Sequence, residues 1–599
     1  MDGLSKPEQI IKRLNELEID TCALTDHGNV SGAIEFLKKM IKAKKKPILG
    51  IEGYVCKYNA KIQDSSNRSL THLLIYAKNN QGWLDLIKLV SESNLPEHYY
   101  YRPRLSLEQL ADFAGNLIIL SGHLGSTLAD VILHDNKVDI QEGITHLKQL
   151  QDIFGKDNVF LESQLIDKQN IKEMAILTNV VREISAKTGV KVVPTGDAHY
   201  CRREDADDQR VLLARALGNK TLAEARQDGA LLCFFNSNNF HIPSYEDMLA
   251  CGHTKEELDN TNYVASLIEE YTNILKPPIL PQFPCPEKYT ADEWLRELCR
   301  KGWREKIANV IPKEEQQVYI DRVKMELNTI GTFGFSDYFL IVEDIVQQVR
   351  KRGGLPNIGR GSAAGCLVSY LTGITQIDPI KYNLIFERFF NAGRGAGTLP
   401  DIDIDVPVAL RDKIIEYIKD QYGHNKVAQM VTFQTIKGRG ALKDVLRCYG
   451  VSFDEMNSIT QHIQDEAKIA DELQEMKEET GESSIIRWAL ENDKQGKLKE
   501  WCYIEDDELK GPYSKRFEQA IRLEGTKAAQ SKHPAGVIIT PVPVNEMCPM
   551  VYDAKNKTTV AGFEMGAIED IGGIKFDILS LNFLDKMMGI KRILETGDI

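Results

Sequence analysis

Residues 400–406 read PDIDIDV, an acidic strand pattern with an aspartate at every second position. Side chains at i, i+2 and i+4 of a strand share one face, so Asp401, Asp403 and Asp405 are predicted to lie opposite the isoleucines. Clustered carboxylates repel one another unless a divalent cation lies among them, and oxygen ligands favour Mg²⁺ or Mn²⁺. The pattern therefore indicates metal-assisted phosphoryl or glycosyl transfer, with a solvated edge strand or a Ca²⁺ loop as the alternatives.

A second strand pattern supplies a third carboxylate. Residues 574–581 read IKFDILSL, in which large apolar side chains alternate with Lys575 and Asp577. The alternation predicts that Lys575 and Asp577 share one face of this strand. Two metal ions about 4 Å apart, held by such carboxylates, would clamp an in-line phosphoryl displacement. We therefore expect Asp577 to complete the acidic site, with Lys575 near the same phosphates.

A glycine-rich turn precedes the acidic strand. Residues 358–365 read IGRGSAAG and are followed by an apolar helix pattern, CLVSYLTGI. Glycines let the backbone approach a phosphate closely, a helix amino terminus favours anions, and Arg360 and Ser362 add donors. The turn lacks the GK[ST] of a P-loop, and a small-residue helix-packing turn is the alternative. Together with the acidic strand, the turn favours a nucleotide triphosphate site.

Composition limits the class of protein. The chain has 599 residues, 74 basic and 87 acidic, with a net charge of −13, which predicts three or four domains and excludes a bulk polyanion binder. Nucleic acid must then be bound by local basic patches; the run KKMIKAKKKP at 38–47 is read as a solvated helix, with DNA contact as the minor alternative. Eleven scattered cysteines and no long apolar run favour a cytoplasmic protein without a membrane partner.

The order of apolar runs suggests several units. Strand and helix patterns alternate over the first 270 residues, which predicts a parallel α/β layer or barrel. Five of the 21 prolines fall between Pro277 and Pro286, a density that predicts a stiff linker or a surface loop. Residues 435–515 are helix-rich and charged, and strand patterns return near the end of the chain.

Longer blocks carry a family resemblance. They are FGFSDYFLIVEDIV (333–346), the turn and its continuation to FERFFN (358–391), LPDIDIDV (399–406), YGHNKVAQMVTFQTIKGRGALKDVLR (422–447), SKHPAGVIIT (531–540) and GIKFDILSL (573–581). In this order they resemble the palm of the C-family replicative DNA polymerases, which are the bacterial DNA polymerase III alpha subunits and their phage relatives. The resemblance covers essentially the whole chain.

The resemblance implies a fold and an activity. The fold is an α/β multidomain one, with a nucleotidyltransferase-like (polymerase beta-like) palm and a helical thumb. The activity is template-directed 5′–3′ nucleotidyl transfer from a dNTP to a primer 3′-hydroxyl. Two Mg²⁺ ions would be held by Asp401, Asp403 and Asp577, but not by Asp405. Nucleotide binding is assigned by the resemblance to Arg360, Gly361, Ser362, Lys575 and Arg394.

One helix pattern carries the expected DNA contact. Arg439, Lys443 and Arg447 recur every four residues, which places three cations on one helical face. A solvated face is the ordinary interpretation of such a stripe. In the family this stretch lies where the thumb meets the DNA backbone, so the resemblance implies phosphate contacts.

The first third of the chain contains a different set of motifs. They are TDHGN (25–29), GIE (50–52), THLLIYAKN (71–79), LSGH (120–123), FLESQ (160–164) and GDAHY (196–200). Convergence of their His, Asp and Glu side chains would make a mixed nitrogen and oxygen metal site that suits Zn²⁺ or Mn²⁺. The predicted ligands are His27, Glu52, His72, Glu162, Asp197 and His199. Each of these histidines alone is more often a satisfied surface or core residue.

The set resembles the polymerase-and-histidinol-phosphatase (PHP) domain, a distorted (β/α) barrel that is a metal-dependent 3′–5′ exonuclease in some polymerases. Two expected features are missing: a His-x-His strand ahead of the first motif, and a histidine after FLESQ, where Leu165, Ile166 and Asp167 stand. His123 stays outside the predicted ligand set because relatives vary there. We therefore expect a structural PHP domain or a weakened exonuclease.

The predicted division of the chain follows these motifs. It comprises a PHP domain (1–274), a Pro-rich linker (275–290), a first palm segment (291–434), a thumb (435–515), a second palm segment with the third aspartate (516–580) and the start of the fingers (581–599). Few residues follow Asp577, so most of the fingers is expected to be missing, and a split polymerase, a truncated product and a fragment all stay open. The expected partners are primer-template DNA, dNTP, a complementary fingers chain and, through it, a sliding clamp. The alternatives are a metal-dependent phosphoesterase and a non-catalytic assembly subunit.

Overall fold

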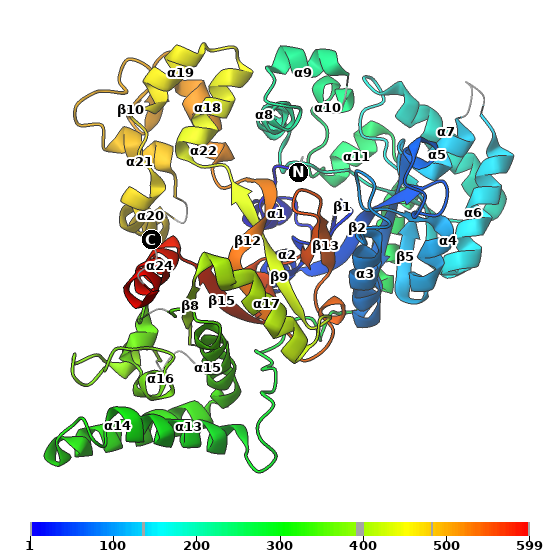
Figure 1. Ribbon diagram of the computed structural model, residues 1–599. Coiled ribbons are helices and arrows are strands. Elements are labelled where there is room, and N and C mark those ends of the chain that lie inside the picture. Colours follow the sequence, from blue (N-terminus) through cyan, green and yellow to red (C-terminus); the bar gives the residue numbers. More distant parts are fainter. Residues whose placement is uncertain are drawn as a thin grey trace.

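The computed structural model describes residues 3–133, 138–229, 231–356, 358–390, 400–480 and 483–596. Figure 1 shows two sheets side by side, with one group of helices above the second sheet and another group below it. The predicted nucleotide ligand Arg394 lies outside the described residues. Within those residues, no helix is both long and apolar enough to cross a membrane.

The first sheet has seven strands in the order β1-β2-β3-β5-β6-β7, with β4 paired to β2. Its strands are β1 (Thr21–His27), β2 (Lys46–Cys56), β3 (Leu70–Ala77), β4 (Leu105–Ser106), β5 (Leu117–Leu120), β6 (Val159–Ser163) and β7 (Val192–Pro194). Strand β3 runs antiparallel to both β2 and β5, so the sheet is mixed, whereas the sequence predicts a parallel layer or barrel. The reason is local: only a single 3₁₀ turn separates β2 from β3, whereas a parallel pair needs a long crossover connection. The order ends at β1 and β7, and no pairing joins them within the described residues.

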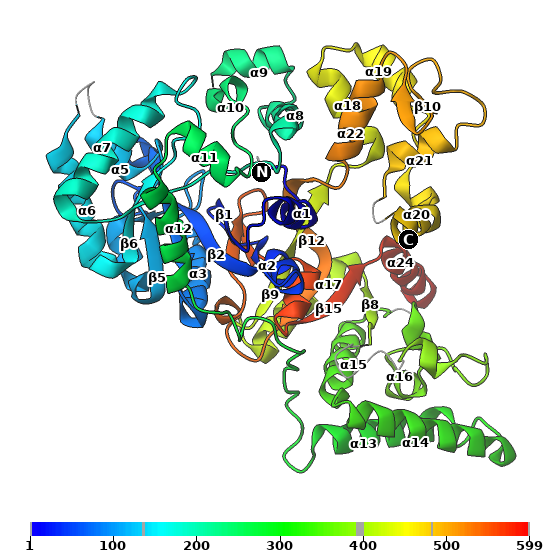
Figure 2. The ribbon, with the colours of Figure 1, turned by 180° about the vertical axis from the view of Figure 1, so that it is seen from behind.

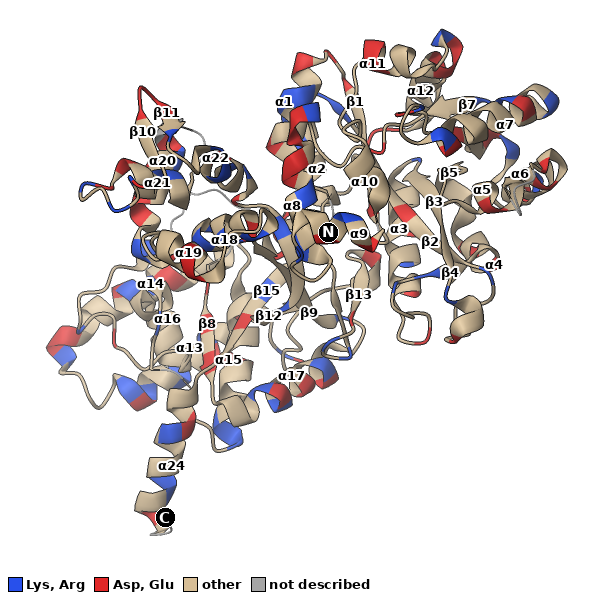
Figure 3. Cartoon of the chain, turned by 90° about the horizontal axis from the view of Figure 1, so that it is seen from above, with Lys and Arg blue, Asp and Glu red and all other residues tan. Residues whose placement is uncertain are grey.

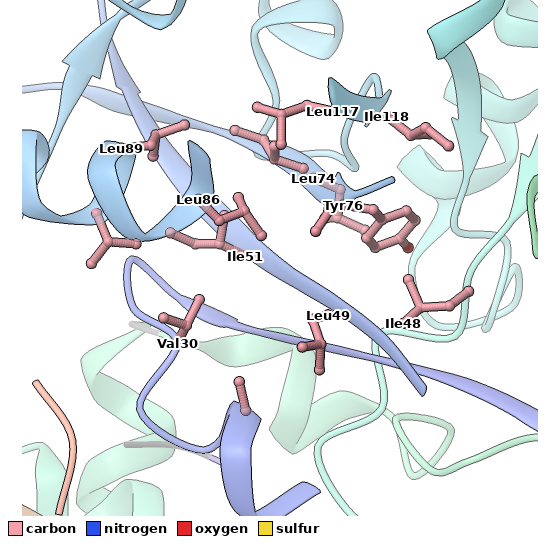
Figure 4. Close-up of a cluster of buried hydrophobic side chains, with 14 of the residues drawn as sticks. Val30, Ile48, Leu49, Ile51, Leu74, Tyr76, Leu86, Leu89, Leu117 and Ile118 are labelled. Atoms are coloured by element: carbon pink, nitrogen blue, oxygen red, sulfur yellow. The ribbon is translucent and has the colours of Figure 1, made fainter. Parts of the chain in front are cut away.

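Helices of residues 7–267 accompany the curled sheet, and those of residues 206–236 share their core with a later helical region rather than with the sheet (Figure 2). The helices are α1 (Pro7–Glu16), α2 (Ala33–Lys42), α3 (Asn80–Ser93), α4 (Leu107–Leu110), α5 (Thr127–Ile132), α6 (Ile140–Phe154), α7 (Lys172–Thr188), α8 (Ala206–Ala216), α9 (Leu222–Asp228), α10 (Leu232–Asn236), α11 (Tyr245–Cys251) and α12 (Lys255–Leu267). Figure 4 shows part of the core, where side chains of β2, β3, β5 and α3 meet. Most apolar residues of the central strands β2 and β3 are buried, and so is Glu52 within β2.

The second sheet has six strands in the order β13-β14-β9-β12-β15-β8. They are β8 (Asp403–Val406), β9 (Val427–Thr435), β12 (Lys527–Ile539), β13 (Met550–Asp553), β14 (Thr558–Ala561) and β15 (Ile574–Ser580). Strands β8 and β15 are parallel neighbours, and their register sets Asp403 beside Asp577. Two segments far apart in the chain therefore bring the predicted carboxylates to one place.

Helices from several regions of the chain flank this sheet. They are α13 (Ala291–Lys306), α14 (Gln316–Thr332), α15 (Ser336–Lys351), α16 (Leu367–Thr372), α17 (Val408–Tyr422), α23 (Met565–Asp570) and α24 (Asn582–Thr596). A separate helical region contains α18 (Gly438–Cys448), α19 (Phe453–Thr460), α20 (Ala470–Thr480), α21 (Ile485–Glu491), the hairpin β10 (Tyr503–Glu505) and β11 (Glu508–Lys510), and α22 (Ser514–Leu523). Helix α22 shares a core with α18, and the chain returns to the sheet only at β12. The helical region thus extends past residue 515, the boundary that the sequence predicts.

Residues 268–290, all of which the structure describes, contain no helix or strand, and the prolines cluster there. This segment nevertheless lies against the second sheet. The backbone N–H of Lys276 donates to the carbonyl of Asp570 at 2.9 Å, and that of Ile279 donates to Gly572 at 2.8 Å. The proline-rich stretch is therefore anchored rather than freely extended.

The two sheets share one continuous apolar core. The rings of Trp83 on α3 and Phe563 stack with centroids 6.4 Å apart, and the backbone N–H of Met550 donates to Ser91 Oγ at 2.9 Å. Lys38 on α2 forms an ion pair of 2.6 Å with Asp570 on α23. The packing holds the first sheet against the β13–β14 side of the second.

Candidate metal-dependent active sites

Three carboxylates meet at the β8–β15 edge of the second sheet. One oxygen from each of Asp401, Asp403 and Asp577 lies within 4.8 Å of the other two. Ile402 and Ile404 are buried between them, as the alternation predicts, while Asp401 is exposed and Asp403 is half-buried. Burial raises the pKa of Asp403, and the charges of Asp401 and Asp577 add to the increase while Arg360 opposes it. The site concentrates negative charge, and Figure 3 shows red acidic residues at β8.

The glycine-rich turn lies directly over these carboxylates. Arg360 Nη2 is 3.2 Å from Asp403 Oδ1, and its Nε is 3.5 Å from Asp405, which is only 2% exposed. Gly361 has a φ of +71°, and a Cβ there would lie 3.3 Å from Asp403 Oδ2. The turn can therefore approach the acidic strand this closely because residue 361 is a glycine. Ser362 begins a 3₁₀ turn beside it.

The third carboxylate has its own partners on β15. Lys575 Nζ lies 2.6 Å from Asp577 Oδ2, on the same face of the strand, and the neighbouring Ile574, Phe576 and Ile578 are buried. Asp577 Oδ1 is buried and has no hydrogen-bond partner within the described residues. A buried carboxylate oxygen without a partner is energetically costly, and a cation would compensate it. The three carboxylates therefore fit a Mg²⁺ or Mn²⁺ site.

The start of helix α16, which the sequence offered as an anion site, is already filled by the chain itself. The carboxylate of Glu326 on α14 accepts the backbone N–H groups of Leu367 at 3.0 Å and Val368 at 2.8 Å. The anion at that helix terminus is thus a carboxylate of the chain itself, and the exposed residues 360–362 of the turn remain as the predicted contacts for a phosphate. Sequence reasoning missed Glu326 because a glutamate in the middle of a helix pattern carries no local signal.

The predicted basic stripe lies along helix α18, where Figure 3 shows blue residues. Arg439 is exposed, and its guanidinium donates to the Ile463 carbonyl at 2.8 Å. Lys443 donates to Asn457 at 2.7 Å, and Arg447 pairs with Asp444 at 2.6 Å. All three cations therefore have partners within the helical region, with Arg439 the most accessible.

A second polar cluster lies at the strand ends of the first sheet, around Glu52 of β2. His72 Nδ1 and His123 Nε2 are 2.6 Å and 2.7 Å from Glu52 Oε1, and His27 Nδ1 is 3.0 Å from Oε2. Ligand atoms of His27, Glu52 and His72 lie within 4.8 Å of one another. His123 is absent from the ligand set that the sequence predicts, although the LSGH motif contains it.

Charge coupling perturbs this cluster strongly. Burial favours a higher pKa for Glu52, but the three imidazoles outweigh it and hold the pKa well below its usual range. Burial opposes the charged form of His123, but contact with Glu52 raises its pKa to about 9. Burial raises the pKa of Glu162 on β6 to about 7. Glu162 Oε1 accepts from Thr195 at 2.5 Å, whereas its Oε2 is buried without a partner in the described structure.

The last two predicted ligands lie at the edge of the same cluster. The ring of His199 is 6.3 Å from that of His27, and its Nδ1 is 2.8 Å from the Asp197 carbonyl. Asp197 has a φ of +44°. The charge of Asp197 acts on both His123 and Glu162. The mixed histidine and carboxylate donors fit a Zn²⁺ or Mn²⁺ site.

The basic run 38–47 serves internal contacts. Lys39 pairs with Glu8 at 2.6 Å, and Lys46 Nζ donates to the carbonyls of Ala265 at 2.7 Å and Ile268 at 2.6 Å. With the Lys38–Asp570 pair, these contacts hold α2 and the start of β2 against their neighbours.

Two family models match the chain. The bacterial DNA polymerase III alpha NTPase domain matches residues 293–580, and the PHP domain matches residues 1–165. DNA polymerase III subunit alpha of Borreliella burgdorferi is 34% identical over 600 residues, covering 100% of this chain. The subunits of Aquifex aeolicus and Thermus aquaticus are 31% and 32% identical, each over 99% of this chain.

This chain belongs to the DNA polymerase III alpha family. It spans about half the length of the curated relatives that it matches, 48% of the Borreliella subunit and 51% of the Aquifex subunit. Among solved structures, a protein described as a metal-dependent phosphoesterase from Bifidobacterium adolescentis aligns with 33% of this chain and 84% of its own, at 12% identity and a TM-score of 0.20. A likeness that weak carries no argument.

The matched ranges of the DNA polymerase III alpha family divide the two clusters. The NTPase model contains the glycine-rich turn, Asp401, Asp403 and Asp577, and the PHP model contains the Glu52 cluster up to Glu162. Asp197 and His199 lie beyond the PHP match.

One further residue near the carboxylates was missed by the sequence reasoning. His533 of the SKHPAG block accepts the backbone N–H of Gly536 at 2.7 Å, and Gly536 pairs with Asp577.

Proposed function

We propose that the second sheet is a nucleotidyltransferase-like palm, and that the chain carries out DNA-templated transfer of a nucleotide from a dNTP to a primer 3′-hydroxyl. The observation that carries the proposal is the meeting of Asp401, Asp403 and Asp577 within 4.8 Å beneath the glycine-rich turn. Membership of the DNA polymerase III alpha family supports the same reaction. The substrates that follow are primer-template DNA and dNTP.

Each group around the carboxylates has a role in this proposal. Asp401, Asp403 and Asp577 would hold two Mg²⁺ ions, which lower the pKa of an attacking hydroxyl and neutralise a leaving pyrophosphate when bound. Arg360 and the turn at Gly361–Ser362 would bind the triphosphate. Lys575, held on the face of Asp577 at 2.6 Å, would place a second positive charge beside the same phosphates.

The helical region from α18 to α22 is the proposed thumb. Arg439 is the most accessible cation of the basic stripe. Lys443 is hydrogen-bonded to Asn457, and Arg447 is paired with Asp444. Contact with DNA phosphates would add to these internal bonds. Since such contacts release counterions, DNA affinity should fall steeply with salt.

Incorporation of a labelled nucleotide opposite a defined template base tests the proposal. Wild type should add only the complementary nucleotide, and Asp403→Ala should lower the rate at least a thousandfold while primer-template affinity stays within twofold. A chain that binds DNA but adds nucleotides equally with and without Asp403 would contradict the proposed active site.

A second activity is favoured by the cluster around Glu52. His27, Glu52 and His72 offer three ligand atoms to one metal ion, and Glu162 adds a buried carboxylate. We propose that this PHP domain is structural or a weakened metal-dependent 3′–5′ exonuclease. The test is metal content together with 3′ degradation of single-stranded DNA, compared between wild type and Glu52→Gln. Fast degradation that survives this substitution would rule out the cluster as its source.

A further inference from the structure

Arg322 and Glu326 of helix α14 form a buried ion pair. The pair hydrogen-bonds to the backbone on both sides of the junction between the glycine-rich turn and helix α16. Glu326 has a side chain that is 0% exposed, and Arg322 one turn earlier donates from Nε to its Oε1 at 2.6 Å. The same carboxylate accepts the N–H groups of Leu367 and Val368. The Cys366 thiol lies 3.3 Å from Glu326 Oε2. Glu326 thus satisfies the first amide groups of α16, which would otherwise be buried donors.

Arg322 hydrogen-bonds to the backbone on the other side of the junction. Its Nη2 donates to the carbonyl of Gly365 at 2.8 Å and to that of Leu384 at 3.2 Å. Gly365 cannot be replaced by a larger residue without a shift, because a Cβ there would lie 2.8 Å from the Ile385 carbonyl. The carboxyl end of the glycine-rich turn is therefore fixed by one guanidinium and one carboxylate.

The other end of the turn meets the carboxylates. Arg360 and Gly361 contact Asp403, and only a few residues separate them from the clamped junction. Gly359 and Gly361 both have positive φ values, +153° and +71°, a backbone conformation that larger residues rarely adopt. Besides the ion pairs of Arg360, the junction with α16 therefore helps to fix the distance of this turn from Asp403.

We propose that Arg322 and Glu326 are positioning residues for the nucleotide, because they hold the glycine-rich turn at the distance from Asp403 that a triphosphate requires. The proposal rests on the proposed polymerase function. Glu326 would then affect nucleotide affinity without contacting the nucleotide. Loss of the Arg322–Glu326 contacts should make the turn more mobile and weaken dNTP binding, with little effect on the binding of DNA by the thumb.

Glu326→Gln is the informative change. An amide has one oxygen in place of two, and its NH₂ group would face donors that now point at a carboxylate. Amide hydrogen exchange in the peptide covering residues 358–372 should become at least tenfold faster. The Kd of Mg²⁺·dNTP for the protein bound to primer-template DNA should rise at least fivefold, with DNA affinity unchanged within twofold.

The chain offers a matched control in its first third. Glu257 is also buried, pairs with Arg182 at 2.6 Å and accepts the N–H of Thr254 at the start of α12. Glu257→Gln should lower the melting temperature but leave exchange in residues 358–372 and dNTP affinity as in wild type. If Glu326→Gln does not fold, Arg322→Lys, which keeps the charge and loses the forked donors, takes its place with the same expectations.

The outcomes separate the two levels of the proposal. Faster exchange in the turn with unchanged dNTP affinity overturns the positioning role, and so does unchanged exchange. Weaker dNTP binding in both Glu326→Gln and the Glu257 control means a general loss of stability and also overturns it. A wild-type protein that binds no dNTP contradicts the proposed function itself, whereas amide hydrogen exchange in residues 358–372 still shows whether Arg322 and Glu326 hold the turn.

Discussion

At the scale of single residues, both sites are built from charged groups that the fold forces together. Asp403 faces Arg360, Asp577 faces Lys575, and Glu52 faces three imidazoles. The contacts of Glu52 with the imidazoles lower its own pKa and raise that of His123, and a pKa that differs between the folded and the unfolded protein makes stability depend on pH. The Glu52 cluster is suited to such a test because its shift is large.

The stability of the metal-free protein should depend on pH through His123. Its folded pKa of about 9 lies above the ordinary value of 6.5, so the charged ring stabilises the fold fully below pH 6.5. That stabilisation, about 1 to 3 kcal/mol, should be lost as the pH rises from 6.5 through 9. Denaturant unfolding in the presence of a chelator, repeated across this window, measures the loss.

Glu52→Gln is the control for this pH dependence. Without the carboxylate, the His123 pKa should return toward its ordinary value or below, and the loss of stability above pH 6.5 should disappear. A wild-type unfolding free energy that stays constant between pH 6.5 and 9 would show that His123 is not charged in the folded protein.

At the scale of elements, sequence patterns predicted what depends on near neighbours. The alternation in 401–405 and 574–578 predicted the burial of Ile402, Ile404 and Phe576, because period two is a local property of a strand, but Asp405 on the carboxylate face is buried as well. Pairing of β8 with β15 joins segments far apart in the chain, and no local pattern contains it, whereas the antiparallel direction of β3 follows from its short connection to β2. The roles of Glu326 and His123 could not be predicted for the same reason, because each side chain contacts an element that is distant in the sequence.

Helix packing below the second sheet gives a prediction at this scale. Gly302 on α13 lies against α16 so closely that a Cβ would be 1.9 Å from the Leu371 carbonyl. Gly302→Ala should therefore force the helices apart and lower the free energy of unfolding by about 2 kcal/mol or more. Denaturant melts of the variant give this value directly.

Gly589 on α24 serves as the matched position, because nothing in the described structure lies within 4 Å of a Cβ there. Gly589→Ala should leave stability unchanged or raise it by up to about 1 kcal/mol, the usual gain of alanine over glycine in a helix. Equal effects of the two substitutions would mean that α13 and α16 are not in close contact.

At the scale of the whole molecule, the first third of the chain is packed against both the second sheet and the helical region. Its core continues into the β13–β14 side of the second sheet, and Asp208 on α8 receives two hydrogen bonds from Arg522 on α22, at 2.6 Å and 3.0 Å. The composition predicted several domains, but it contains no information about how they dock. The family resemblance predicted the order of the domains, whereas their contacts come from the structure alone.

The link between α8 and α22 can be cut at one residue. Asp208 is 1% exposed, so Arg522→Ala would leave its buried carboxylate without a bidentate partner. The expected loss is about 1 to 3 kcal/mol of stability, measured by denaturant unfolding. Arg304→Ala, which removes an exposed pair with Glu297 at 3.6 Å, should change stability by less than about 0.5 kcal/mol. A loss at Arg522 no larger than that at Arg304 would mean that the contact does not hold the two regions together.

The metal ions of the proposed palm can be located without relying on turnover. Crystals grown with Mn²⁺, primer-template DNA and a non-hydrolysable dNTP would show each bound ion by its anomalous scattering. We predict two peaks about 4 Å apart among the carboxylates of Asp401, Asp403 and Asp577, with the triphosphate beneath Arg360 and Gly361. A triphosphate bound at the turn with no ion at these three carboxylates would contradict the proposed reaction.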